Sequence, residues 1–154
     1  MAKTDFNIAV EISAPQPRVW SVMADVERWP EWTASISRVK RLSPGPLQVG
    51  SRVRIHQPKL PPAFWRVTEL RPGESFTFIS RAPGVRVTAR HTADVIAGGT
   101  RAMLSIHYAG LLGTLLAKLV GEVNERYLAM EAEGLKARCA ELVARNYLQH
   151  HEAH

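Results

Sequence analysis

The stretch at residues 85–95, VRVTARHTADV, decides the fold class. Valine, alanine and one histidine occupy its odd positions, and arginine, threonine and aspartate occupy its even positions. This period of two predicts a β-strand with one dry face and one wet face. His91 is the polar residue in the dry column, so we expect its imidazole to point into the interior.

Other stretches share this character and are separated by short turn signals. Strands are predicted at 5–12, 34–42, 51–57, 63–70, 75–81 and 100–110. The connections after residue 34 are too short for crossover helices, so the strands form antiparallel hairpins. Pro15 and Pro17 open a short helix after the first strand, and Pro30 interrupts a second helical turn.

From Leu111 to Tyr147 the apolar period becomes helical, which predicts one long helix that bends or frays near Gly121 and Gly134. We expect this helix to cover the sheet with a stripe of large side chains: Leu112, Leu115, Leu116, Leu119, Val123, Tyr127 and Met130. The predicted fold is therefore α+β: a curved antiparallel sheet of about seven strands gripping a long C-terminal helix, with two short helices between strands one and two. Residues 1–154 form one domain.

Hairpin register predicts which side chains share the inner face. A two-residue turn at Gly98-Gly99 sets His91 opposite Ile106 and Ala89 opposite Tyr108. The turns at 82–85 and 71–74 set Phe76 beside His91, Val67 beside Phe78 and Glu69 beside Phe76. The inner face then contains Trp65, Val67, Phe76, Phe78, Ala89, Ile106 and Tyr108, with Glu69, Ser80 and His91 as polar members.

Composition narrows the class of protein. The chain has 154 residues, of which 45% are hydrophobic and 22% charged, as in an ordinary globular domain. It shows no signal peptide and no apolar run of about 20 residues, so we expect a soluble, cytoplasmic protein. The single cysteine, Cys139, excludes an internal disulfide and a multi-thiolate zinc site.

The net charge of +6 favours an anionic partner. The basic residues are spread along the strands, where they form a solvated face, so nucleic-acid binding is not expected. A membrane surface is a possible partner. The sequence does not define the oligomeric state.

Several short sequence segments occur in the order typical of one superfamily. They are VWSVMADVERWPEW (19–32), PPAFWRVTEL (61–70), FISRAPGVRVTARHT (78–92), GGTRAMLSI (98–106) and YLAMEAEGLKARCAE (127–141). The chain resembles the START-like, helix-grip superfamily in its polyketide cyclase/dehydrase (SRPBCC) branch. This resemblance implies a hydrophobic cavity between sheet and helix that binds a small, largely apolar molecule. It supplies no invariant catalytic motif.

His91 is the strongest candidate for a functional residue. A neutral imidazole in an apolar cavity can hydrogen-bond a ligand or serve as a general acid/base, and the alternative is a structural histidine. The residues expected to contact a ligand are Trp65, Val67, Phe76, Phe78, Ser80, Ala89, His91, Ile106, Tyr108, Leu116, Val123 and Tyr127. Trp29 and Trp32 either seal the core or gate the cavity, and the loop at 58–62 forms a rigid rim.

Metal and cofactor sites are not expected. By strand parity His56 and His107 point outward, and His150, His151 and His154 lie at the C-terminus, so no ligand set converges. Glu69 is interpreted as a rim carboxylate facing water. Cys139 has no adjacent His–acid arrangement that would make it a nucleophile.

Three functions follow from these observations. The first is a carrier or sensor of a small aromatic, polyketide-like or isoprenoid ligand. The second is a cyclase/dehydrase-type enzyme that uses His91 for proton transfer. The third is a membrane-associated lipid or quinone chaperone. Loss of turnover with retained binding after substitution of His91 favours the enzyme, whereas salt-sensitive binding to anionic vesicles favours the chaperone.

Overall fold

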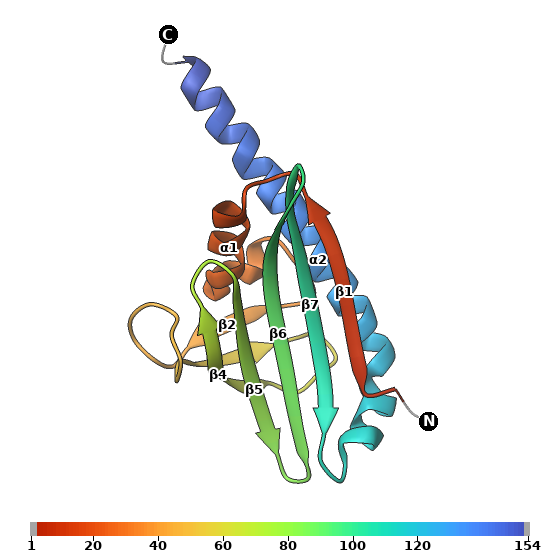
Figure 1. The fold of residues 1–154 in the computed structure, drawn as a ribbon. Helices are drawn as coiled ribbons and strands as arrows, with labels where there is room; N and C mark the ends of the chain where they lie inside the picture. The colour runs from red at the N-terminus through yellow and green to blue at the C-terminus, as the bar shows by residue number, and fades with distance from the viewer. Residues whose placement is uncertain (1–2, 153–154) are drawn as a thin grey trace.

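A computed structural model describes residues 3–152 and contains the predicted antiparallel sheet (Figure 1). The spatial order of the strands is β1-β7-β6-β5-β4-β3-β2. The strands are β1 (Asp5–Ile12), β2 (Arg38–Arg41), β3 (Arg52–His56), β4 (Ala63–Arg71), β5 (Ser75–Ala82), β6 (Val85–Ile96) and β7 (Gly99–Ala109). The alternation of apolar and polar residues therefore predicted the strands and their meander order correctly.

Two short helices connect β1 to β2, as predicted. They are α1 (Gln16–Ala24) and the 3₁₀ helix η1 (Val26–Glu31). The chain ends in α2 (Gly113–Glu152), one uninterrupted helix that lies along the inner face of the sheet and extends past it (Figure 1). The fold is thus the expected helix-grip arrangement, in which the sheet buries its dry face on a single long helix.

The face that α2 presents to the sheet differs from the predicted one. Its first turns contact the sheet through Gly113, Ala117 and Gly121, whereas Leu115 and Leu119 are exposed. Small side chains are required here because a Cβ on Gly121 would lie 3.0 Å from the Phe6 ring. The predicted stripe was therefore wrong for Leu112, Leu115 and Leu119, which are exposed, whereas Leu116 packs against an apolar cluster and Tyr127 is buried.

The second expected weak point, Gly134, is also a site of close packing. A Cβ at this position would fall inside van der Waals contact with the backbone oxygen of Trp32. Glycine lets α2 approach the connection that follows η1, so the residue fixes the position of the helix.

Hairpin registers were predicted correctly for β5–β6 and in part elsewhere. Phe76 pairs with His91, and Val67 pairs with Phe78, as expected. His91, however, pairs with Leu104 instead of Ile106. The turn is Ala97-Gly98, where Gly98 adopts a φ of 83°. Gly99 stays in the strand because its backbone packs against the carbonyl oxygen of Ile12.

A β-bulge changes the direction of Glu69. The register between β4 and β5 shifts between Val67 and Glu69, so Leu70 pairs with Phe76 and Glu69 pairs with Thr77. Glu69 is exposed and Leu70 packs against the core. The prediction that Glu69 shares the inner face was wrong because one extra residue in a strand moves the following side chains to the other face.

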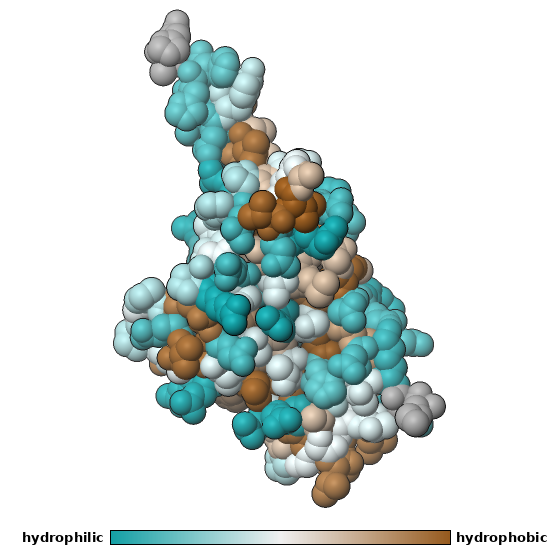
Figure 2. Space-filling view, viewed as in Figure 1, coloured by the Kyte–Doolittle hydropathy of each residue, from teal (hydrophilic) through white to brown (hydrophobic). Residues whose placement is uncertain are grey.

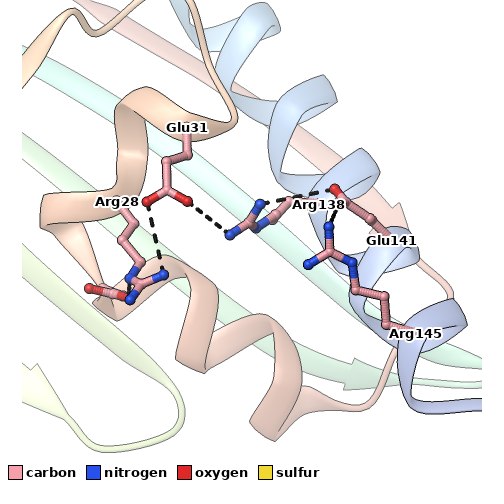
Figure 3. Close-up of polar contacts among 6 residues, drawn as sticks. Arg28, Glu31, Arg138, Glu141 and Arg145 are labelled. Carbon is pink, nitrogen blue, oxygen red and sulfur yellow. Dashed lines mark hydrogen bonds and ion pairs between the residues drawn. The ribbon is translucent and has the colours of Figure 1, made fainter. Parts of the chain in front are cut away.

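Ion pairs join η1 to the second half of α2 (Figure 3). Arg138 lies 3.1 Å from Glu31, which in turn lies 4.0 Å from Arg28. Glu141 extends the chain of charges to Arg145. Exposed pairs of this kind contribute little individually, but this set lies beside the Gly134 contact and holds the same two elements in register.

Replacing Gly121 and Gly134 by alanine should distinguish the effect of close packing on stability from the effect of helix propensity. Gly134→Ala should lower the free energy of unfolding by about 2–3 kcal/mol, because backbone atoms cannot retreat from the new methyl group. Gly121→Ala should stay within about 1 kcal/mol of wild type, since the gain in helix propensity offsets a small shift of the Phe6 ring. Urea unfolding followed by circular dichroism measures both. Equal effects of the two substitutions would contradict the close approach at Gly134.

Candidate functional site

A cavity of about 50 Å³ lies between the inner face of the sheet and the middle of α2. A smaller one of about 10 Å³ shares five lining residues with it: Trp29, Ile36, His91, Leu104 and Glu131. The larger cavity is further lined by Ile55, Gln57, Trp65, Phe78, Ala89, Ser105, Ile106, Asn124, Tyr127 and Leu128. Its wall is therefore mostly apolar and aromatic, with polar groups supplied chiefly by α2 and β6.

His91 points inward, as the alternation of β6 predicted. Its ring stacks on Phe76 with centroids 4.5 Å apart and an interplanar angle of 9°. Trp29 and Phe78 each lie 5.3 Å away from it. The side chain is only 8% exposed, so desolvation lowers the pKa of His91 to about 3. The imidazole is therefore neutral at pH 7.

Among residues 3–152, the Nδ1 atom of His91 has no hydrogen-bond partner, although it is shielded from solvent. Buried polar atoms in native proteins are nearly always paired, and an unpaired one costs about 1–3 kcal/mol. His91 borders both cavities, so its imidazole is one of the polar groups in a mostly apolar wall.

Glu131 supplies a second ionisable group to both cavities. Burial raises the pKa of Glu131 to about 7, and a hydrogen bond from Ser35 Oγ at 3.5 Å opposes this shift. Ser35 is fully buried and is itself linked to the hydroxyl of Thr33 at 2.7 Å. At neutral pH the Glu131 carboxyl is therefore divided between its acid and base forms, which is the condition for proton transfer.

Two tyrosines take part in hydrogen bonds that join α2 to other parts of the fold near the cavity. The Tyr127 hydroxyl donates to the carbonyl oxygen of Pro58, which ties α2 to the loop at 58–62. Asn124 donates to the hydroxyl of Tyr108 on β7, and burial raises the pKa of Tyr108 to about 12. Both bonds fix the position of the helical segment that carries the lining residues Asn124 and Tyr127.

The two tryptophans of η1 and its C-cap have different surroundings. Trp29 is buried, and its indole N–H donates to the carbonyl oxygen of Met23 at 3.0 Å. Trp32 is half-buried, and its indole nitrogen has no partner within residues 3–152. Trp29 thus packs as part of the core, as the sealing interpretation predicted, while Trp32 lines the smaller cavity.

The sequence matches one known protein family. The family described as polyketide cyclase/dehydrase and lipid transport matches residues 3–140. The chain belongs to this family. No curated protein matches it.

Three solved structures illustrate the likeness of fold. The Zhui aromatase/cyclase from Streptomyces sp. R1128 is 19% identical, with a TM-score of 0.74 over 90% of this chain and 94% of that one. The protein TTHA0849 from Thermus thermophilus is 19% identical, with a TM-score of 0.71 over 90% and 98%. A START superfamily protein from Mycobacterium smegmatis is 18% identical, with a TM-score of 0.68 over 88% and 99%.

Half of the residues that the sequence predicted to contact a ligand line the cavity. Those lining it are Trp65, Phe78, Ala89, His91, Ile106 and Tyr127. They come from four neighbouring strands and α2, as the inner-face parity indicated. Their contact with a ligand stays a prediction.

The other six expected residues do not line the cavity. Val67 and Phe76 are buried in the main core, and Tyr108 and Leu116 belong to a second apolar cluster around Phe6 and Ala117. Ser80 and Val123 are half-buried. The alternation of the strands does not distinguish residues that line the cavity from residues that pack in the surrounding core.

Asn124 and Glu131 were missed, although their spacing contained a signal. Together with Tyr127 they stand at i, i+3 and i+7 and so share one helical face. Polar residues on that face point into the cavity because Gly121, one turn earlier, brings α2 close to the sheet. The search for a large apolar stripe excluded them.

The remaining titratable candidates lie elsewhere. His107 is exposed and contacts Asp5 at 2.6 Å, as expected for an outward residue. His56 is half-buried, with its Nε2 enclosed and unpartnered among the described atoms. Burial raises the pKa of the Cys139 thiol to about 11, which disfavours a thiolate. Residues 3–152 contain no cluster of three or more His, Cys, Asp or Glu suited to a metal ion. His150 and His151 are exposed, and His154 lies outside the described residues.

Stability should depend on pH with opposite signs at His91 and Glu131. The folded-state pKa of His91 is below its ordinary value of 6.5, so the unfolded chain binds the extra proton and stability falls as the pH drops from 6.5 toward 3. The folded-state pKa of Glu131 is above its ordinary value of 4.5, so stability falls as the pH rises from 4.5 toward 7. Each slope approaches about 1.4 kcal/mol per pH unit.

Urea unfolding of wild type, His91→Gln and Glu131→Gln across this pH range measures the two slopes. The difference between wild type and His91→Gln should fall with decreasing pH, and the difference between wild type and Glu131→Gln should fall with increasing pH. Glu122→Gln, an exposed substitution on the same helix, is the control and should show neither trend. Parallel curves for all four proteins would contradict the burial of both groups.

Proposed function

We propose that this protein binds a small hydrophobic molecule that carries one hydrogen-bonding group, and acts as a carrier or sensor of it. The observation that carries the proposal is the buried imidazole of His91, which borders the cavity among aromatic side chains and whose Nδ1 has no partner among residues 3–152. Apolar walls with few polar groups are typical of small-molecule sites. An aromatic alcohol or ketone, a polyketide-like ring or an isoprenoid quinone has this chemistry.

The small volume of the cavity sets a requirement on binding. Its volume of about 50 Å³ is below the range of about 300–1,000 Å³ typical of ligand sites. The lining aromatic side chains must therefore move when a ligand enters. Tyr127 lines the cavity and its hydroxyl donates to the Pro58 carbonyl oxygen, so we expect this hydrogen bond to break when the wall opens.

A matched pair of probes tests the proposal: 2-naphthol and naphthalene, which differ by one hydroxyl. Wild type should bind 2-naphthol about fivefold more tightly, the effect of a hydrogen bond worth about 1 kcal/mol. His91→Phe should keep the aromatic packing and lose the preference. Quenching of tryptophan fluorescence measures the affinities.

Ser80→Ala, which is half-buried and outside the cavity lining, is the control and should retain the preference. Failure of wild type to bind either probe, or an unchanged preference in His91→Phe, would refute the proposal. Native mass spectrometry of freshly purified protein should also show an added mass that is lost on denaturation.

A second candidate function is proton transfer at a carbon beside a carbonyl group, as in a cyclase/dehydrase. The observation that favours it is that Glu131 and His91 border the same two cavities. The Glu131 carboxylate would remove the α-proton, and neutral His91 would donate an N–H hydrogen bond to the developing enolate oxygen. The low pKa of His91 makes it a poor base. In this second function the proton is therefore removed by Glu131, whereas the sequence led us to expect proton transfer by His91.

Deuterium exchange at the α-carbons of cyclohexanone, followed by NMR, tests this second function. Wild type should accelerate exchange, with the rate rising through a midpoint near the Glu131 pKa of about 7. Glu131→Gln should abolish the acceleration, and Glu122→Gln should not. If exchange in the presence of wild type equals that in buffer, this chemistry is excluded for simple ketones.

A further inference from the structure

The first part of α2 and the turn before it expose leucines to solvent. Leu111, Leu112, Leu115 and Leu119 are 98%, 48%, 54% and 72% exposed. We name these four residues the leucine surface. Single exposed leucines are ordinary, but four within nine residues form a contiguous apolar patch, which marks an interaction site.

The leucine surface lies at one end of the molecule. Leu112 packs over Gly84 in the β5–β6 turn, and its backbone N–H donates to the Gly84 carbonyl oxygen at 2.9 Å. Apolar side chains gather at the lower end of the molecule, where β7 passes into α2 (Figures 1 and 2). A flat partner could therefore touch the leucines and the tip of the hairpin together.

Positive charge flanks this end. Arg81 and Arg86 are directly opposite each other on either side of the Pro83-Gly84 turn, and Lys118 lies between the exposed leucines of α2. Like charges in direct cross-strand pairs are unfavourable. None of the three has an ion-pair partner in the part of the chain that the structure describes. An anionic partner would relieve this repulsion.

We propose that the leucine surface inserts into the interface of an anionic lipid bilayer, with Arg81, Arg86 and Lys118 against the headgroup phosphates. Shallow insertion of leucines beside basic residues is how peripheral proteins bind membranes. A bilayer fits better than a second copy of the chain, because two copies would bring these basic groups together. No helix within residues 3–152 is long and apolar enough to cross a membrane.

The proposal gives the membrane partner a specific surface. From the sequence, a membrane was a possible partner because of the overall charge, whereas the structure concentrates the apolar contact at one end. Only the purpose of docking rests on the proposed function, since a carrier of an apolar ligand must exchange it with a membrane. Docking itself requires no ligand in the cavity.

Sedimentation of the full chain with vesicles tests the proposal. Wild type should bind vesicles of phosphatidylcholine and phosphatidylglycerol, and weakly bind phosphatidylcholine alone. Leu111→Ser/Leu115→Ser/Leu119→Ser should weaken binding at least about tenfold. Arg81→Gln/Arg86→Gln should weaken it less and reduce its dependence on salt. Val143→Ser/Tyr147→Ser/Leu148→Ser, at the other end of α2, is the matched control and should bind as wild type does.

Circular dichroism melts confirm that each variant is folded, and naphthol affinity is measured for each separately. Unchanged naphthol affinity with lost vesicle binding supports docking independently of the cavity function. Absence of wild-type binding to the anionic vesicles overturns the proposal, as does equal binding by the leucine variant. Sedimentation equilibrium showing a dimer that the leucine variant loses would also overturn it, in favour of a second copy.

Discussion

The close approach of α2 to the sheet is the constraint on which the rest of the structure depends. A Cβ on Gly113 or Gly121 would make a tight contact with Tyr108 or Phe6, and a Cβ on Gly134 would overlap the backbone oxygen of Trp32. In the first turns Gly113, Ala117 and Gly121 therefore face the sheet most closely, and Leu116 and Val120 pack beside them. The leucine surface is turned outward, while Asn124 and Glu131 line the cavity.

The same closeness explains the state of the two ionisable groups. An imidazole enclosed by Phe76, Phe78 and Trp29 loses its hydration and gains no charged partner in return, so the neutral form is favoured. Glu131 receives only a long hydrogen bond from Ser35, which does not compensate for the loss of water. Both groups reduce stability at one end of the pH range. Such a cost is common at sites that bind or react.

Strand patterns predicted more of the molecule than helix patterns did. The β6–β7 register was wrong by two residues, yet His91 still faced inward, because an even shift leaves every side chain on its own face. Glu69 was misplaced because a bulge is an odd shift, and nothing in the local alternation indicates one. The prediction of which face of α2 meets the sheet failed in its first turns for another reason. Periodicity identifies large apolar side chains, whereas close packing requires small ones.

The two parts of α2 pack against different apolar clusters. Leu135, Cys139 and the partly buried Leu142 belong to the main core, whereas Ala117 and the partly buried Leu116 and Val120 pack with Phe6 and Tyr108. The leucine surface lies on the outer side of the first turns, and the helical wall of the cavity begins at Asn124, on the turns that follow. The proposed docking surface and the ligand cavity therefore lie on one continuous helix, so a displacement of α2 at a membrane would act directly on the cavity wall.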